Sequence, residues 1–196
     1  MVARCPRTRA LGVCVSTGVP AVRERVPHAE AGIGAIATQA NTNVLYGTRT
    51  LRLLEMGLSP RDALETMLRE DPQQETRQVI VIDARGRTAA FTGRRTIGWR
   101  GHLIGRDYVV AGNMLSGGEV IRAMVEAFEE LGDRPLPERL MGSLEAGQEA
   151  GGDRRGEVSS ALLVVGPPSV AIDLRVDRHP DPVKELRRLF DAHARR

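Results

Sequence analysis

The feature that most constrains the fold of this chain is the order in which its predicted strands and helices follow one another. Short apolar or alternating segments, typical of strands, arrive in adjacent groups, and helical segments, mostly in pairs, separate these groups. A doubly wound parallel sheet requires strict alternation of strand and helix, which this chain lacks. Adjacent antiparallel strands separated by helix pairs favour two sheets faced by helical layers. We therefore predict the α+β class, with two mainly antiparallel sheets between helical layers.

The boundaries of these segments follow from periodicity, caps and turn residues. The predicted strands are Val2–Cys5, Leu11–Thr17, Gly32–Thr38, Gln78–Ile82, Thr88–Thr92, Thr96–Trp99, Asp107–Ala111, Val158–Val165 and Ala171–Val176. The predicted helices run from the polar cluster Gln39–Asn43 to about Met56, from Pro60, over Gly117–Leu131, from Pro137 and from Pro182. Ser59 is predicted to cap the second helix. Leu11–Thr17 contains a continuous apolar run, which predicts a strand covered on both faces.

Composition excludes several classes of function. The 196 residues suit one domain, residues 1–196, and 41% apolar with 27% charged residues is the balance of a globular protein. Apolar runs such as Ala161–Val165 are too short to span a bilayer, and we see no signal peptide. Of the 28 basic residues, Lys184 is the one lysine, and the charges are interleaved with Asp and Glu without stacking aromatics. We therefore expect no membrane or nucleic-acid partner. Two cysteines suit a cytoplasmic location.

Several unusual strings in one order along the chain carry a family resemblance. They are Gly32–Gly47 (GIGAIATQANTNVLYG), Gly112–Leu115 (GNML), Gly151–Val165 (GGDRRGEVSSALLVV) and Ile172–Val183 (IDLRVDRHPDPV), with Gly101-His102 and Asp83–Gly86 in addition. On these strings the chain resembles the domain-of-unknown-function 1028 family, which is placed in the Ntn-hydrolase superfamily. The resemblance covers essentially the whole chain. It implies a single Ntn-hydrolase-like domain with a four-layer αββα sandwich.

The resemblance also implies a mechanism. In Ntn hydrolases the amino-terminal Thr, Ser or Cys supplies the nucleophile, and its free α-amine is the base, because that amine titrates near neutrality. Members of the resembled family open with a Thr-aromatic-Ser-Ile-Val-Ala-Arg string. Met1 falls where that string has Ile, and Val2-Ala3-Arg4 continues it, so the Thr has no counterpart. Either the first strand is truncated and the natural chain begins upstream, or the protein has lost the chemistry. We favour the first alternative because everything downstream keeps the family's pattern.

Polar residues at predicted strand ends are the first site candidates. Ser16 lies at the end of the strand that is expected to pair with the first strand. Its hydroxyl could orient an amino-terminal amine, or it could form only a hydrogen bond to the backbone. Gln39 and Asn43 lie between a strand end and a helix start, where amides can bind a substrate oxyanion or cap the helix. Asn113 follows a strand within Gly-Asn-Met and is predicted to position substrate, although Gly-Asn is also an ordinary turn.

A glycine-flanked loop and one histidine complete the candidates. Asp153 is predicted to tune the amine, and Arg155 to clamp a carboxylate-bearing substrate; the alternative is an ion pair that holds the loop. His102 is a candidate substrate contact or a strand-end histidine with local bonds. The histidines show no metal-ligand spacing, so no metal and no cofactor are expected. Cys14, between two valines, is predicted to be a buried apolar residue rather than a nucleophile.

Two functions of different classes remain. The first is an Ntn-type amidohydrolase acting on a small amide or ureide, with its nucleophile at an amino-terminal Thr missing from the printed chain. The second is a catalytically silent binding or assembly protein with the same fold. A role in cell-wall metabolism is a third alternative, since some members of the resembled family are fused to a peptidoglycan-binding module. A small-molecule substrate is the expected partner. The oligomeric state is left open, and a homo-oligomer is one alternative.

Overall fold

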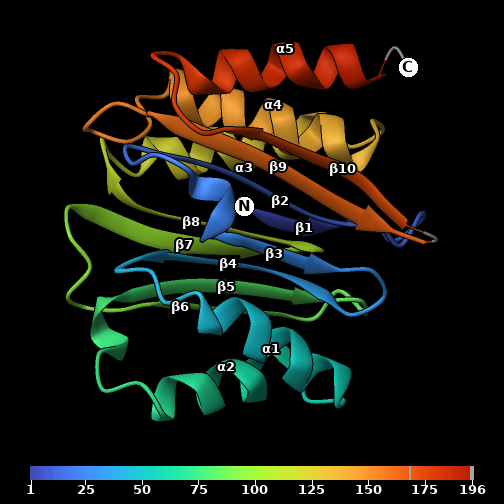
Figure 1. Cartoon of the computed structure of the whole chain (residues 1–196), viewed down its shortest axis with the longest axis vertical. Coiled ribbons are helices and arrows are strands. Elements are labelled where there is room, and N and C mark those ends of the chain that lie inside the picture. Colours follow the sequence, from blue (N-terminus) through green and yellow to red (C-terminus); the bar gives the residue numbers. More distant parts are fainter. Residues whose placement is uncertain (168, 195–196) are drawn as a thin grey trace.

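The computed structural model describes residues 1–167 and 169–194, which form two antiparallel sheets and five α-helices (Figure 1). The six-stranded sheet has the order β10 (Ser169–Val176), β9 (Ser159–Gly166), β2 (Leu11–Thr17), β1 (Val2–Arg4), β8 (Tyr108–Leu115) and β7 (Trp99–Gly105). The four-stranded sheet has the order β3 (Pro27–Glu30), β4 (Gly34–Ala40), β5 (Arg77–Asp83) and β6 (Thr88–Thr92). The helices are α1 (Leu45–Glu55), α2 (Pro60–Arg69), α3 (Glu119–Glu130), α4 (Leu136–Glu149) and α5 (Pro182–Ala194). The predicted α+β class with two antiparallel sheets is confirmed.

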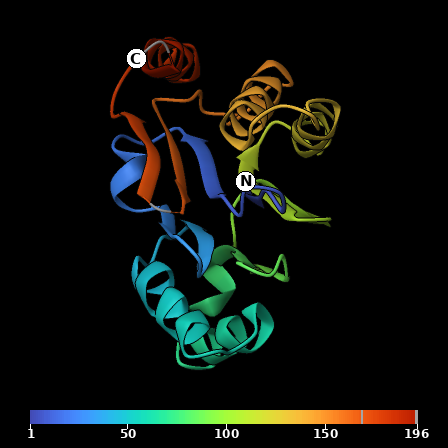
Figure 2. The same ribbon diagram turned by 90° about the vertical axis from the view of Figure 1, so that its right-hand side faces the viewer.

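Three apolar cores hold these elements together, and strand alternation decides which residues enter each core. On β2, Val13 and Val15 face the core between the two sheets, whereas Cys14 faces the core that α3, α4 and α5 share with the six-stranded sheet. A third core lies between the four-stranded sheet and the pair α1 and α2. Figure 2 shows these two helix groups at opposite ends of the molecule. Because β2 is covered on both faces, its apolar run is buried, as predicted.

Local capping sets several of the observed boundaries. The Ser59 hydroxyl accepts a hydrogen bond from the backbone N–H of Asp62 at 3.2 Å, and Pro60 occupies the first position of α2. The preceding helix α1 ends just before Gly57, whose φ of 97° lies in the left-handed region that glycine adopts without strain. The predicted cap and the end of the first helix near Met56 are therefore confirmed.

Two strand predictions were wrong. The sequence predicts no strand between Thr17 and Gly32, but Pro27–Glu30 forms β3, an edge strand that pairs with β4 alone. A proline is tolerated there because it is the first residue of an edge strand. The expected strand Thr96–Trp99 is a turn, in which the Thr96 hydroxyl donates to the Gly93 carbonyl at 2.8 Å and Gly98 has φ 72°. The strand begins at Trp99 instead.

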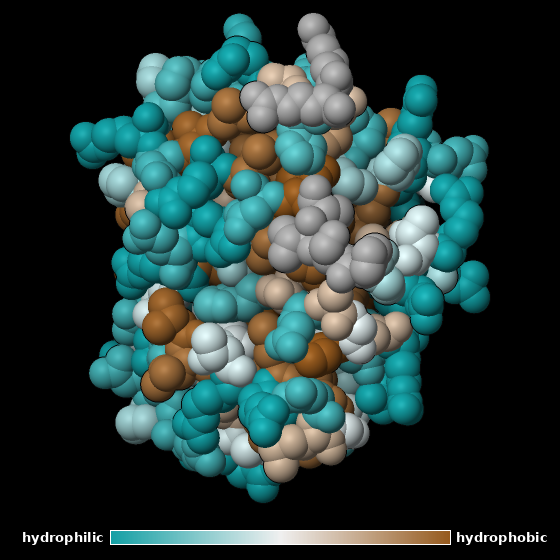
Figure 3. Space-filling model, turned by 45° about the vertical axis from the view of Figure 1, so that its right-hand side comes forward, coloured by the Kyte–Doolittle hydropathy of each residue, from teal (hydrophilic) through white to brown (hydrophobic). Residues whose placement is uncertain are grey.

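The surface carries mixed polar and apolar groups. Figure 3 shows a face dominated by hydrophilic side chains, with hydrophobic patches between them. The large exposed apolar side chains include Met56, Ile97 and Ile104, which come from three different parts of the chain. Such a scatter is ordinary for a globular surface. None of the helices that the structure describes has the length and apolar character required to cross a bilayer.

Candidate functional site

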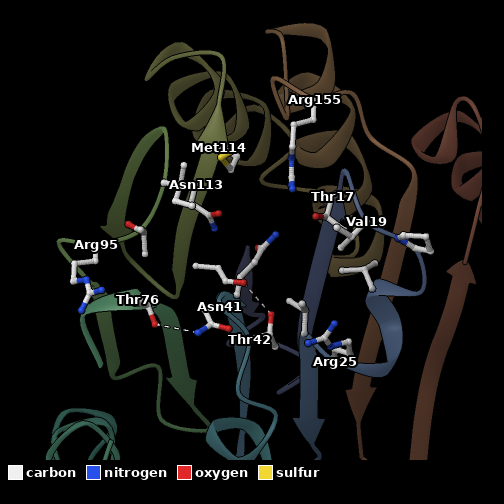
Figure 4. A pocket seen from close by; sticks show the side chains of 17 residues that line it. Thr17, Val19, Arg25, Asn41, Thr42, Thr76, Arg95, Asn113, Met114 and Arg155 are labelled. Carbon is white, nitrogen blue, oxygen red and sulfur yellow. Dashed lines mark hydrogen bonds between the residues drawn. The ribbon is translucent and has the colours of Figure 1, made fainter. Parts of the chain in front are cut away.

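A cavity of about 540 Å³ opens where β2, β4 and β8 end, and we call it the outer cavity (Figure 4). Its polar groups come from six segments that are far apart in the sequence. They belong to Thr17, Arg25, Gln39, Asn41, Thr42, Thr76, Arg95, Thr96, Asn113 and Arg155. A concave space of this size with a few convergent polar groups is the usual form of a small-molecule site.

Backbone strain marks two residues of the outer cavity. Ala40 has φ 69° and Met114 has φ 57°, and both line the cavity. Residues other than glycine rarely adopt this left-handed conformation, because their Cβ atoms meet the following carbonyl. Ala40 ends β4 and turns the chain so that Asn41 and Thr42 face the cavity. Strain of this kind persists where the surrounding structure enforces it, often at binding sites.

A narrow inner slot continues from the outer cavity into the six-stranded sheet. It holds about 50 Å³, and it shares Gln39 and Asn113 with the outer cavity and is further lined by Ser16, Asp153 and other residues. The slot lies in line with β1, which has three residues, whereas its neighbours β2 and β8 have seven and eight. β1 separates β2 from β8 only up to Met1. Past Met1, no strand in the described part of the chain lies between the carboxyl-terminal ends of β2 and β8. The slot therefore lies where a longer β1 would continue.

Met1 closes the inner end of this slot. Its ammonium donates to the Cys14 carbonyl at 2.8 Å, and the Cys14 N–H donates back to the Met1 carbonyl at 3.1 Å. The residue is 4% exposed, and Figures 1 and 2 both place the amino terminus in the middle of the molecule. Next along β1, Val2 pairs with Val13 on one side and with Val109 on the other. The strand register is thus defined up to the slot.

Gln78 orients the shared amide of Asn113. It is 2% exposed on β5, and its Nε2 lies 2.9 Å from the carbonyl of Gly112, 3.1 Å from that of Gly101 and 3.0 Å from the Thr92 hydroxyl. Its Oε1 accepts a hydrogen bond from Asn113 Nδ2 at 3.1 Å. Gln78 therefore joins the two sheets and fixes one side of the Asn113 amide. This role of Gln78 was not predicted, although a glutamine that opens a buried apolar strand is a signal for a buried hydrogen-bonding group.

The glycine-flanked loop is held by an ion pair. Asp153 is 8% exposed and accepts bonds from Arg155 Nη2 at 2.6 Å, Arg155 Nε at 2.9 Å and the Gly18 N–H at 3.0 Å. Burial raises the pKa of this carboxyl, but the bonds from Arg155 and Gly18 outweigh burial and hold the pKa below its usual value. Beside it, the Ser16 hydroxyl lies 3.4 Å from Glu157 Oε1. Asp153 and Ser16 therefore line the slot together, while Arg155 points into the outer cavity (Figure 4).

Two predicted site residues lie elsewhere. Asn43 accepts a hydrogen bond from the Leu45 N–H at 3.1 Å at the start of α1, which is the capping alternative. His102 lies on β7, where its Nδ1 is 2.9 Å from the Thr92 hydroxyl. Neither lines the outer cavity or the slot. Asn41, which follows the left-handed residue Ala40, lines the outer cavity instead.

The two remaining candidates are the Cys14 thiol as a nucleophile and a cluster of metal ligands. Cys14 is fully buried, as predicted, and burial raises the pKa of its thiol above the ordinary value. A buried thiol of raised pKa is a poor nucleophile. Among the residues that the structure describes, no group of three or more His, Cys, Asp or Glu side chains is placed to hold a metal ion.

Comparison with known proteins identifies the family. No curated protein matches this chain. The crystal structure of a Silicibacter pomeroyi protein of the DUF1028 family is 33% identical, with a TM-score of 0.91, and the match covers 97% of this chain and 83% of that one. Anbu (ancestral beta-subunit) from Yersinia bercovieri is 9% identical with a TM-score of 0.42, over 98% of this chain and 93% of that one. Residues 1–186 match the family described as "Family of unknown function (DUF1028)". The chain belongs to that family.

Proposed function

We propose that this protein is an Ntn-type amidohydrolase that acts on a small amide or ureide. The nucleophile is a threonine three residues before Met1, in a natural chain that begins upstream of the printed one. The proposal includes a four-layer αββα sandwich, in which the two sheets lie between α1 and α2 on one side and α3, α4 and α5 on the other. The observation that carries the proposal is the position of the inner slot, which lies in line with β1 between the ends of β2 and β8, so that the register of β1 leads into it.

The register gives each added residue a definite place. Antiparallel pairing opposes Val2 to Val13 and to Val109, so each step toward the amino terminus moves one residue forward on β2 and β8. The third residue before Met1 then stands between Thr17 and Asn113. Both of these residues line the outer cavity. An amino-terminal threonine in that position is at the cavity, where a substrate can reach it.

Strand alternation also gives each added side chain a direction. Met1 contributes to the core beneath the helices and Val2 to the core between the sheets. The first added residue therefore faces the sheet interface, and the second faces the slot wall of Val120, Met124 and Leu144. The third, the threonine, again faces the sheet interface, toward Gln39. A Thr-aromatic-Ser extension suits this pattern, because the aromatic ring meets the apolar wall.

The reaction uses the amine and the hydroxyl of this one residue. The α-amine takes the hydroxyl proton, and the freed oxygen attacks the substrate's amide carbon. Side-chain N–H groups of Gln39 and Asn113 donate to the resulting oxyanion. The C–N bond then breaks, the leaving amine takes the proton back from the ammonium, and water hydrolyses the ester. The Asp153 and Ser16 groups beside the slot hold the amine in place.

The proposal is tested with a chain that carries Thr-Phe-Ser before Met1, after removal of the initiator methionine. A β-lactone, which is a strained ester, acylates an activated amino-terminal hydroxyl without knowledge of the natural substrate. We expect one acyl adduct on the threonine, seen by intact mass and peptide mapping. The same chain with alanine in place of that threonine, and the chain that begins at Met1, are the controls. If the lactone labels all three forms equally, or none, the proposed nucleophile is wrong.

The natural amino terminus is measured separately, by the intact mass of the protein expressed from its native gene with its upstream DNA. A mass that fits a Thr-led extension supports the hydrolase. A mass that fits Met1 or Val2 as the first residue contradicts it and leaves a binding protein of the same fold.

A further inference from the structure

We propose that the outer cavity binds a ligand that carries at least one carboxylate, so that the substrate is an acidic amide or ureide. This inference rests on the proposed function only in calling the ligand a substrate. Its basis is the charge of the cavity wall, which the hydrolase chemistry does not use.

Three guanidinium groups surround the outer cavity. Arg25 follows the short 3-10 helix Val22–Glu24, Arg95 lies in the loop between β6 and β7, and Arg155 belongs to the glycine-flanked loop. Figure 4 shows them on three sides of the space, with Arg95 opposite Arg25 and Arg155 above. Among the described residues that line the cavity there is no aspartate or glutamate. The described lining therefore holds three guanidinium groups and no carboxylate of its own.

The three arginines differ in what already holds them. Arg155 makes two side-chain bonds to Asp153, at 2.6 and 2.9 Å, so its charge is largely neutralised. Within residues 1–167 and 169–194, neither the Arg25 nor the Arg95 guanidinium takes part in an ion pair or a hydrogen bond, although the Arg25 carbonyl lies 3.4 Å from His28 Nε2. Some exposed arginines elsewhere, such as Arg175, are paired with carboxylates, and others, such as Arg106, are not, so it is the position of Arg25 and Arg95 on one cavity that matters. Two unpaired guanidiniums on one cavity are thus free to bind an anion.

The rest of the wall suits a carboxylate on a short carbon skeleton. Hydroxyl and amide groups of Thr42 and Asn41 lie between the two unpaired arginines, and Val19 and Val26 supply an apolar side. Guanidinium groups prefer planar carboxylates, to which they donate two parallel hydrogen bonds. With its carboxylate held at the rim, a ligand directs its amide toward Gln39 and Asn113 at the mouth of the slot.

Direct binding tests this inference without any chemical step. The probe is succinate, and succinamide is its uncharged analogue of the same skeleton. Amide chemical shifts of the ¹⁵N-labelled protein report where and how tightly each binds. We expect succinate to shift the amides of the outer cavity, and succinamide to bind at least tenfold more weakly. Added sodium chloride should weaken succinate binding further, because salt screens exposed charges.

Charge-removing variants give the second readout. In R25Q and R95Q succinate binding should fall about tenfold each, and the double variant should fall further. R106Q is the matched control, because Arg106 is an exposed arginine at the far end of β8, in the turn between β7 and β8. Equal binding of succinate and succinamide overturns the proposal, as does an unchanged succinate affinity in the double variant.

The two proposals fail separately. Binding of succinate that depends on Arg25 and Arg95, together with no lactone adduct on the Thr-extended chain, leaves the acidic-ligand site standing and removes the hydrolase. A lactone adduct without arginine-dependent succinate binding does the reverse.

Discussion

The inner slot and the outer cavity meet at Gln39 and Asn113, yet they are built in different ways. The slot is bounded by strand backbones in a set register, by the buried Gln78 amide behind Asn113 and by the apolar faces of α3 and α4. The outer cavity is bounded by loops and by exposed side chains such as Arg25 and Arg95. In the proposed function, the sheet would set the position of the reacting group, whereas the loops would select among ligands. Changes in the slot should therefore cost stability, and changes in the cavity rim should alter binding alone.

The largest effect is expected for Gln78→Leu. The substitution removes the donor to the buried Gly112 carbonyl and the part-buried Gly101 carbonyl and the acceptor for Asn113, and each unsatisfied buried group costs about 1–3 kcal/mol. We expect a loss of about 3 kcal/mol in the free energy of unfolding, measured by urea denaturation. Gln39→Leu is the matched control, because the Gln39 side chain has no hydrogen-bond partner among the described residues. Equal losses in the two variants would break the comparison.

Next comes the Thr-Phe-Ser extension. Its phenylalanine should bury its ring against the apolar wall of the slot, and burying such a ring contributes about 1.5–3 kcal/mol. We expect the extended chain to unfold at a higher urea concentration than the chain beginning at Met1. Replacing that phenylalanine by alanine should remove most of the gain. A gain that survives the replacement places the extension outside the slot.

A smaller, pH-dependent effect is expected for Asp153→Asn. The carboxyl of Asp153 has its pKa held below the ordinary value, so the folded protein binds this proton less readily than the unfolded chain. Its stabilising contribution is present above the unfolded pKa of about 3.9 and is lost as the pH falls through the lower folded value. The partner Arg155 is 40% exposed, so we expect about 1 kcal/mol at pH 7. Urea unfolding at pH 7 and pH 3 should show the difference between parent and variant shrinking at pH 3; a constant difference contradicts the assignment.

The smallest effect on stability is expected for the double substitution of Arg25 and Arg95 by glutamine. Exposed side chains without partners contribute within about 0.5 kcal/mol. The urea midpoint should therefore stay where it is, while succinate binding falls. A loss of stability comparable to that of Gln78→Leu would show that these arginines hold the fold rather than serve a ligand.

Much of the fold could be predicted because it depends on local signals. The apolar run of β2, the adjacent strands β5 and β6 and the Ser59 cap can all be predicted from residues that are close together in the sequence. Gln39 is predicted as a site residue from its place at a strand end and Asn113 from the Gly-Asn-Met string of the family resemblance, and both line the slot and the outer cavity. Arg25 and Arg95 were not predicted. The chain has 28 basic residues, of which one is lysine and 27 are arginine. Among so many arginines, nothing in the neighbouring sequence distinguishes one that lines a cavity from one on the open surface.

The sequence by itself determined the alternation, the turns and the element order of this protein, because these depend on side chains a few positions apart. The tertiary structure alone decided which strand ends share a cavity and which arginines remain without a carboxylate. Those properties depend on the pairing of segments such as β2 and β8, which are about a hundred residues apart. Asn43 and Asn41 illustrate the division. Both are polar residues in the predicted cluster that follows the left-handed residue Ala40. In the structure Asn43 caps α1, whereas Asn41 lines the outer cavity.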